Sequence, residues 1–235
     1  MPFMPYYGMF FDPTYILIVI GAVISMWASM RVNSTYQKYS TVRSASGITG
    51  AEAAARILRS QGLHGVQIEH VHGNLTDHYV PRSKVLRLSD AVYNSTSVAA
   101  IGVAAHECGH AIQDQQEYTP LRLRSAIVPV AQFGSYACWL FIAGGVFFGF
   151  NEFLINLGIL LFSLSVIFQL VTLPVEFDAS KRALAILGDT GILGEQELKG
   201  SKKVLSAAAL TYVAAAAAAI LSLLRLLILF GNRRD

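Results

Sequence analysis

Four long apolar segments limit the class of fold that this chain can adopt. They span residues 15–30, 126–150, 153–173 and 204–230. A helix needs about 20 apolar residues to cross the hydrocarbon core of a bilayer, so each segment is close to crossing length. Hydrophobic residues make up 54% of the chain and charged residues only 14%, whereas about 25% of a soluble domain is charged. The sequence therefore predicts a mainly α-helical integral membrane protein with about four transmembrane helices.

The distribution of lysine and arginine predicts the orientation of these helices. Residues 31–124 carry ten of them and residues 174–203 carry five, whereas residues 1–13 and 151–152 carry none. The positive-inside rule places the two basic segments in the cytoplasm, which predicts a multi-pass protein of the cell (inner) membrane. Residues 1–12 are rich in aromatic side chains, as expected at a membrane interface.

Two topologies remain open for the last apolar segment. If it crosses the membrane, Arg233 and Arg234 lie outside, and Arg225 is placed near the far interface, where its side chain can snorkel. The alternative is a helix that lies partly along the membrane.

Between the first two apolar segments, residues 31–124 are polar enough to form a domain. Thr49 and Glu52 form a capping-box pattern, which predicts a helix over 51–61 that ends at Gly62. Strict alternation predicts a strand at 66–71, followed by a turn at Gly73-Asn74. Two further strands are expected at 79–80 and 85–88, and then a helix that begins near Thr96 as its N-cap.

That last helix carries the pentapeptide His106-Glu107-Cys108-Gly109-His110 after an apolar run. In a helix, His106 and His110 lie one turn apart on the same face. Two such imidazoles can bind one tetrahedral zinc ion and leave room for a third protein ligand and a water. Glu107 can reach that water as the general base. The alternative is a helix with two surface histidines, but the apolar flank favours a buried helix, whose polar groups need partners.

The residues alone leave the third ligand open. The candidates are Glu176, which follows a transmembrane helix expected to end at Pro174, and the histidines His64, His70, His72 and His78. A second interpretation is that Glu176 and Asp178 pair with Lys181 and Arg182 at the start of a solvated helix.

Three stretches carry a family resemblance: residues 104–113, residues 173–180, and Asp77-His78-Tyr79 ahead of 84–89. The chain resembles the YugP-type family of bacterial neutral zinc metallopeptidases, related in pattern to the HtpX/Ste24 class. The resemblance implies that Glu176 is the third ligand, so that His106, His110 and Glu176 hold one Zn²⁺ per chain. In the HtpX/Ste24 pattern an aspartate stands four residues after this glutamate, whereas here that position is Ser180. The role of that aspartate in orienting a histidine ligand would pass to Ser180 or Asp178.

We therefore expect five parts in the chain. They are a transmembrane anchor at 1–30, a small cytoplasmic α+β zincin-like (gluzincin) domain at 31–124, a transmembrane hairpin at 125–173, a cytoplasmic third-ligand segment at 174–203, and a transmembrane or membrane-packed helix at 204–235. The expected function is that of a membrane-embedded metalloendopeptidase. It would cleave peptides or membrane-protein segments near the cytoplasmic surface, with a zinc-activated water and Glu107 as general base. Tyr93, Tyr118, His78 and Arg182 are candidates for the oxyanion stabiliser.

A non-catalytic membrane scaffold with a structural zinc site is the competing hypothesis. Such a site needs a fourth protein ligand, and the nearby candidate, Cys108, lies on the wrong face of the helix. We expect both Cys108 and Cys138 to be free thiols. The sequence lacks the basic stripe with interleaved aromatic residues that is typical of nucleic-acid binding, so we do not expect a nucleic-acid partner. The expected partners are the lipid bilayer, a substrate and an unidentified membrane protein or second copy of the chain.

Overall fold

The computed structural model describes residues 12–231, so the aromatic residues 1–11 and the two arginines near the C-terminus lie outside the described residues. The chain forms two compact units. We call residues 1–28, 124–171 and 212–235 the helical unit, and residues 29–123 and 172–211 the α+β unit. Each unit is described by itself.

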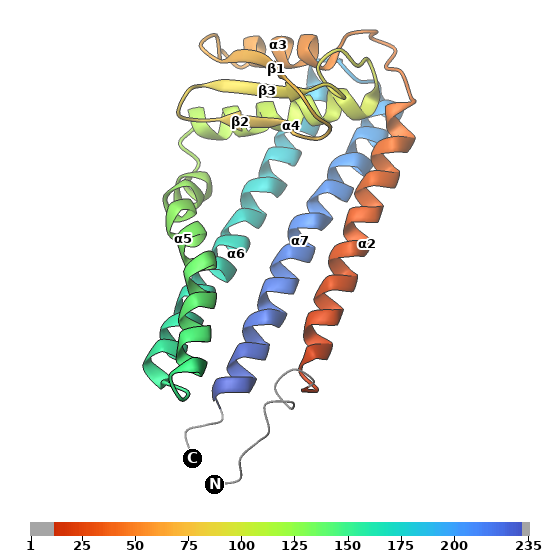
Figure 1. Cartoon of the computed structure of the whole chain (residues 1–235). Helices are drawn as coiled ribbons and strands as arrows, with labels where there is room; N and C mark the ends of the chain where they lie inside the picture. The colour runs from red at the N-terminus through yellow and green to blue at the C-terminus, as the bar shows by residue number, and fades with distance from the viewer. Residues whose placement is uncertain (1–11, 232–235) are drawn as a thin grey trace. The chain divides into compact units, whose positions relative to one another are not determined.

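Four helices are long and apolar enough to cross a membrane, which confirms the mainly helical class and the predicted number of such helices. They are α2 (Tyr15–Ser40), α5 (Thr119–Phe147), α6 (Glu152–Asp189) and α7 (Glu195–Gly231) (Figure 1). Each of them extends beyond its expected segment at one end or both. Helix α2 continues beyond Arg31 and α7 begins ahead of residue 204, because charged residues end an apolar segment without ending a helix.

The prediction that a helix ends at Pro174 is wrong, because α6 continues through this proline to Asp189. A proline removes one backbone hydrogen bond inside a helix, but the residues beyond it are buried. Val175, Ala179 and Ala183 are at most 1% exposed. Burial of this helix face offsets the lost hydrogen bond, and it also fixes the position of Glu176.

Glycines let the helices of the helical unit approach closely. A Cβ on Gly134 would lie 3.0 Å from the carbonyl oxygen of Leu161, and one on Gly158 would lie 2.9 Å from that of Cys138. Helices α5 and α6 therefore pack backbone to backbone as a hairpin. In the same unit the Arg225 guanidinium lies 3.0 Å from the Asp12 carboxylate.

The α+β unit contains a three-stranded sheet, as the sequence predicts. Its strands are β1 (Gln67–Val71), β2 (His78–Val80) and β3 (Val85–Ser89), in the order β1-β3-β2. Strand β1 is parallel to β3, and β2 is antiparallel to it. Helix α3 (Gly50–Ser60) precedes the sheet and has the predicted capping box at Thr49 and Glu52. The sheet lies beside α3 and α4 (Figure 1).

Helix α4 (Val98–Gln115) carries the histidine motif and is buried along most of its length. Its N-cap is Ser97 and not Thr96 as predicted, since the Ser97 hydroxyl accepts a hydrogen bond from the Ala100 amide. The core around α4 is filled by fully buried side chains from four elements, including Ile57, Leu86, Leu88, Ile101 and Leu187. Both cysteines are free, as expected. The motif is thus held on a rigid, buried helix.

Candidate metal centre

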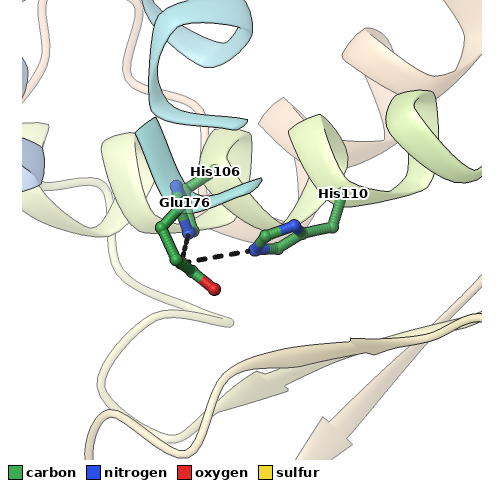
Figure 2. A group of neighbouring side chains, drawn as sticks. All are labelled: His106, His110 and Glu176. Atoms are coloured by element: carbon green, nitrogen blue, oxygen red, sulfur yellow. Dashed lines mark hydrogen bonds and ion pairs between the residues drawn. The ribbon is translucent and has the colours of Figure 1, made fainter. Parts of the chain in front are cut away.

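Three predicted site residues meet within the α+β unit. Helix α4 presents His106 and His110 one turn apart, and α6 directs Glu176 toward both rings (Figure 2). The Glu176 Oε2 atom lies 3.2 Å from the His106 Nε2 atom and 3.6 Å from the His110 Nε2 atom. These are the only three His, Cys, Asp or Glu residues among those described whose ligand atoms could together hold a metal.

The spacing of the three ligand atoms fits zinc. Histidine nitrogens and carboxylate oxygens lie about 2.0–2.2 Å from zinc, so two ligands of a tetrahedral ion are roughly 3.3–3.5 Å apart. The separations of 3.2 and 3.6 Å match this value closely. Two imidazoles and one carboxylate are also a donor set that zinc prefers. The residues present therefore fit the metal.

Each histidine ring is oriented by a hydrogen bond to its other nitrogen. The His106 Nδ1 atom lies 3.1 Å from the Ser180 hydroxyl oxygen, and the His110 Nδ1 atom lies 3.0 Å from the Gln113 amide oxygen. With Nδ1–H donating to its partner, the Nε2 atom beside Glu176 can bind a metal through its lone pair or, when it is also protonated, donate to the carboxylate. The tautomer with a bare Nε2 is the one that a metal ligand needs.

Gln113 is itself fixed in orientation. Its side chain is fully buried, and its amide nitrogen donates to the Val175 carbonyl and to the Asp178 carboxylate, each at 2.8 Å. Asp178 in turn accepts a hydrogen bond from Arg182. Because the amide nitrogen has two acceptors, the amide oxygen is left to face His110. The second interpretation therefore holds only for the ion pair of Asp178 with Arg182, whereas Glu176 is buried and faces His106 and His110.

The electrostatics of the centre favour a charged carboxylate. Glu176 lies beyond the expected 153–173 span, and burial alone would raise the pKa of its carboxyl. Hydrogen bonds from His106 and His110 hold that pKa well below its usual value. Burial opposes protonation of His110, but the carboxylates of Glu176 and Glu107 raise the pKa of this imidazole above its usual value. The negative charges of Glu176 and Glu107 therefore favour a cation at this centre.

Glu107 is 8% exposed and lies close enough to influence two neighbouring groups. Its charge contributes to the raised pKa of His110 and, after burial, to the raised pKa of Asp77. Within residues 12–231 its carboxylate makes no hydrogen bond or ion pair. A buried carboxylate beside the centre with no protein partner remains free to accept a proton.

A glycine sets the distance between α4 and α6 at this point. A Cβ on Gly109 would lie 2.5 Å from the carbonyl oxygen of Ala179, and 3.1 Å from its Cα. Ala179 is in the turn that follows Glu176. The glycine of the pentapeptide thus lets the two ligand-bearing helices approach closely enough to share one centre.

The other predicted candidates are placed elsewhere. His70 and His72 contact Asp90 at 2.7 and 3.5 Å, and His78 contacts the Thr76 carbonyl. His64 is exposed. The Cys108 thiol faces the Ala54 carbonyl of α3 at 3.7 Å. None of them belongs to the group around Glu176 in the described part of the chain.

Arg182 and Tyr118, two of the candidates for the oxyanion stabiliser, contact each other. The Arg182 guanidinium lies 5.7 Å from the centre of the Tyr118 ring and also binds Gln116.

Gln113 was not identified from the sequence as a residue of the site. Its position three residues after His110 on the same helix face was the available signal.

Comparison with known proteins adds two findings. Residues 14–231 match a family model described as "Putative neutral zinc metallopeptidase". The chain is also similar to the "Putative membrane protease YugP" of Bacillus subtilis (strain 168), with 50% identity over 222 residues that cover 94% of this chain and 98% of the relative. No solved structure matches the chain.

Proposed function

Because the chain belongs to this family of putative neutral zinc metallopeptidases, we propose that it is a membrane zinc endopeptidase whose metal ligands are His106, His110 and Glu176. One Zn²⁺ per chain is expected. The observation that carries the proposal is the convergence of three ligand atoms, from two helices, at separations of 3.2 and 3.6 Å.

Each residue of the centre has a definite task in this proposal. His106 and His110 hold the metal through Nε2, oriented by Ser180 and Gln113. Glu176 brings a negative charge that is already ionised at neutral pH, since hydrogen bonding outweighs the effect of burial on its pKa. When bound, zinc would supply a Lewis acid that polarises the scissile carbonyl and acidifies a water molecule.

Glu107 is the proposed general base. Its carboxylate takes a proton from the attacking water and later delivers it to the leaving amine. The lack of a protein partner for this carboxylate within residues 12–231 supports the assignment, because both oxygens remain available.

The proposed substrate is an extended peptide or a membrane-protein segment. Strands β1 and β2 pair with β3 on one side only, and an edge strand can bind a substrate backbone by strand addition. The α+β unit would then act as a zincin-like catalytic domain. We propose that the protein is a multi-pass protein of the inner membrane and that this unit faces the cytoplasm, because it carries most of the lysines and arginines.

The main alternative is a structural zinc site in a non-catalytic scaffold. A structural site is closed by a fourth protein ligand, and the described residues supply three. Cys108 points instead toward Ala54. The open fourth position favours catalysis.

A substitution at Glu107 separates binding of the metal from catalysis. The Glu107→Gln protein should retain zinc by elemental analysis and lose cleavage of a casein substrate, while wild-type cleavage should be blocked by a chelator. Glu69→Gln, which removes an exposed carboxylate paired with Arg87, is the matched control and should cleave normally. Cleavage by Glu107→Gln at the wild-type rate would refute the assignment of the base.

A further inference from the structure

A second site lies in the α+β unit, where the end of α2 faces the start of α7. The two helices line an open cavity of about 800 Å³. Five cationic side chains line it, and none of the residues that line it is acidic. These cations are Arg31, Lys38, Lys199, Lys202 and Lys203. None of them touches the candidate metal centre.

Helical spacing explains why the charges converge. Arg31 and Lys38 are seven residues apart and lie on one face of α2, two turns from each other. Lys199 lies three and four residues ahead of Lys202 and Lys203, which places these three side chains along one face of α7. The helices meet closely at Gly200, where a Cβ would lie 2.8 Å from the Tyr39 ring. Two cationic helix faces are thus held side by side.

The described part of the chain provides no counterion for this cluster. Among residues 12–231, none of the five cations forms an ion pair with a carboxylate. The Lys38 ammonium nitrogen lies 5.8 Å from the centre of the Tyr39 ring, which carries no charge to balance it. Five like charges around one cavity repel one another, so an anionic ligand would relieve this repulsion.

The rest of the lining indicates that the ligand is amphipathic. Beyond its lysines, α7 contributes Ser206, then Ala207 and Leu210, to the same cavity. The helix then continues into the apolar segment 211–230. Lys38 and the three lysines of α7 therefore lie toward the Gly200 end of the cavity, and the other end carries Ala207 and Leu210 together with Arg31. This mixed lining matches a lipid with a phosphate headgroup better than it matches a free phosphate ion.

We infer that this cavity binds the phosphate headgroup of an anionic phospholipid, with the four lysines around the headgroup, Arg31 at its membrane side and Leu210 toward the acyl chains. The cations stand at the borders of two apolar, membrane-length segments, which is where lipid phosphates lie. This site does not depend on the proposed peptidase activity.

The inference can be tested with the full chain purified in a neutral detergent. Binding of short-chain phosphatidylglycerol is compared with binding of phosphatidylcholine of the same chain length and of inorganic phosphate. Phosphatidylglycerol should bind more tightly than either one, and its affinity should fall as salt is added. These comparisons use the wild-type protein alone, so they do not depend on the folding of a variant.

A triple variant, Lys199→Gln with Lys202→Gln and Lys203→Gln, then locates the site. Each cation near an anionic lipid contributes roughly fivefold in affinity, so the variant should bind phosphatidylglycerol at least about tenfold more weakly. The control is a variant with Arg56→Gln, Arg59→Gln and Arg82→Gln, which removes three exposed charges of the same unit outside the cavity. The control should bind like wild type, and both variants should retain zinc.

Three results would overturn the inference. One is equal binding of phosphatidylglycerol and phosphatidylcholine, and another is an equal loss of binding in both triple variants. The third is inorganic phosphate binding as tightly as phosphatidylglycerol, which would assign the cavity to a soluble anion.

Discussion

Gly109→Ala tests whether close approach of α4 and α6 creates the metal centre. The added methyl group would lie 2.5 Å from the carbonyl oxygen of Ala179, whereas carbon–oxygen contacts need about 3.4 Å. The contacted atom belongs to the backbone, so α6 must withdraw locally by about 0.9 Å. Glu176 lies one turn before Ala179 and would move with it.

The Gly109→Ala substitution should change both the free energy of unfolding and the affinity for zinc. Replacing a helical glycine by alanine gains about 0.5–1 kcal/mol, and overpacking costs about 1–3 kcal/mol, so the free energy of unfolding should fall by at most about 2.5 kcal/mol. Metal–ligand distances tolerate only about 0.2 Å. We therefore expect zinc affinity to fall about 10- to 100-fold, in line with the loss of support for a ligand.

The assay is zinc competition against a chromophoric chelator, together with thermal unfolding of the metal-free protein. Gly188→Ala is the control, because it adds the same methyl group to α6 where the nearest atom, Leu198 Cδ2, is 3.4 Å away. The control should bind zinc like wild type. If Gly109→Ala also binds zinc with wild-type affinity, the close approach of the two helices is not what forms the centre.

Further predictions concern the neighbours of the centre. Glu176→Ala should lose zinc, measured by elemental analysis, because it removes one of three ligands. Gln113→Leu removes the hydrogen bond to His110 and should weaken zinc binding about 10-fold or more. Cys108→Ala should retain zinc and activity, since the thiol faces α3; zinc loss there would favour a structural site. Zinc affinity should fall as the pH drops through the raised pKa of His110, because protons compete for its Nε2 atom, and a zinc affinity that does not change with pH would contradict this.

The sequence predicted the elements of the fold where local signals were strong. The capping box at Thr49 and the alternation before Val71 set the start of α3 and the strand β1 correctly. Helix ends were predicted less well at Arg31 and Pro174. A charge or a proline weakens one turn locally, whereas the burial of Ala179 and Ala183, which keeps α6 helical, is a tertiary effect.

The residues of the candidate site also differ in how well the sequence predicted them, depending on whether the signal was local or came from helix packing. Spacing alone placed His106 and His110 on one helix face, since both residues lie in one element. Glu176 was one candidate among several until the family resemblance favoured it, because nothing in the sequence states which helices pack together. Gln113 and Gly109 depend on that packing, one by reaching Val175 and the other by contacting Ala179.

X-ray absorption spectroscopy at the zinc edge of the purified full chain would measure the coordination of the metal itself. We predict one zinc per chain, with two imidazole nitrogens and one carboxylate oxygen at about 2.0–2.2 Å and a non-protein oxygen as the fourth neighbour. A sulfur neighbour at about 2.3 Å, or an unchanged spectrum in the Glu176→Ala protein, would contradict a centre formed by His106, His110 and Glu176.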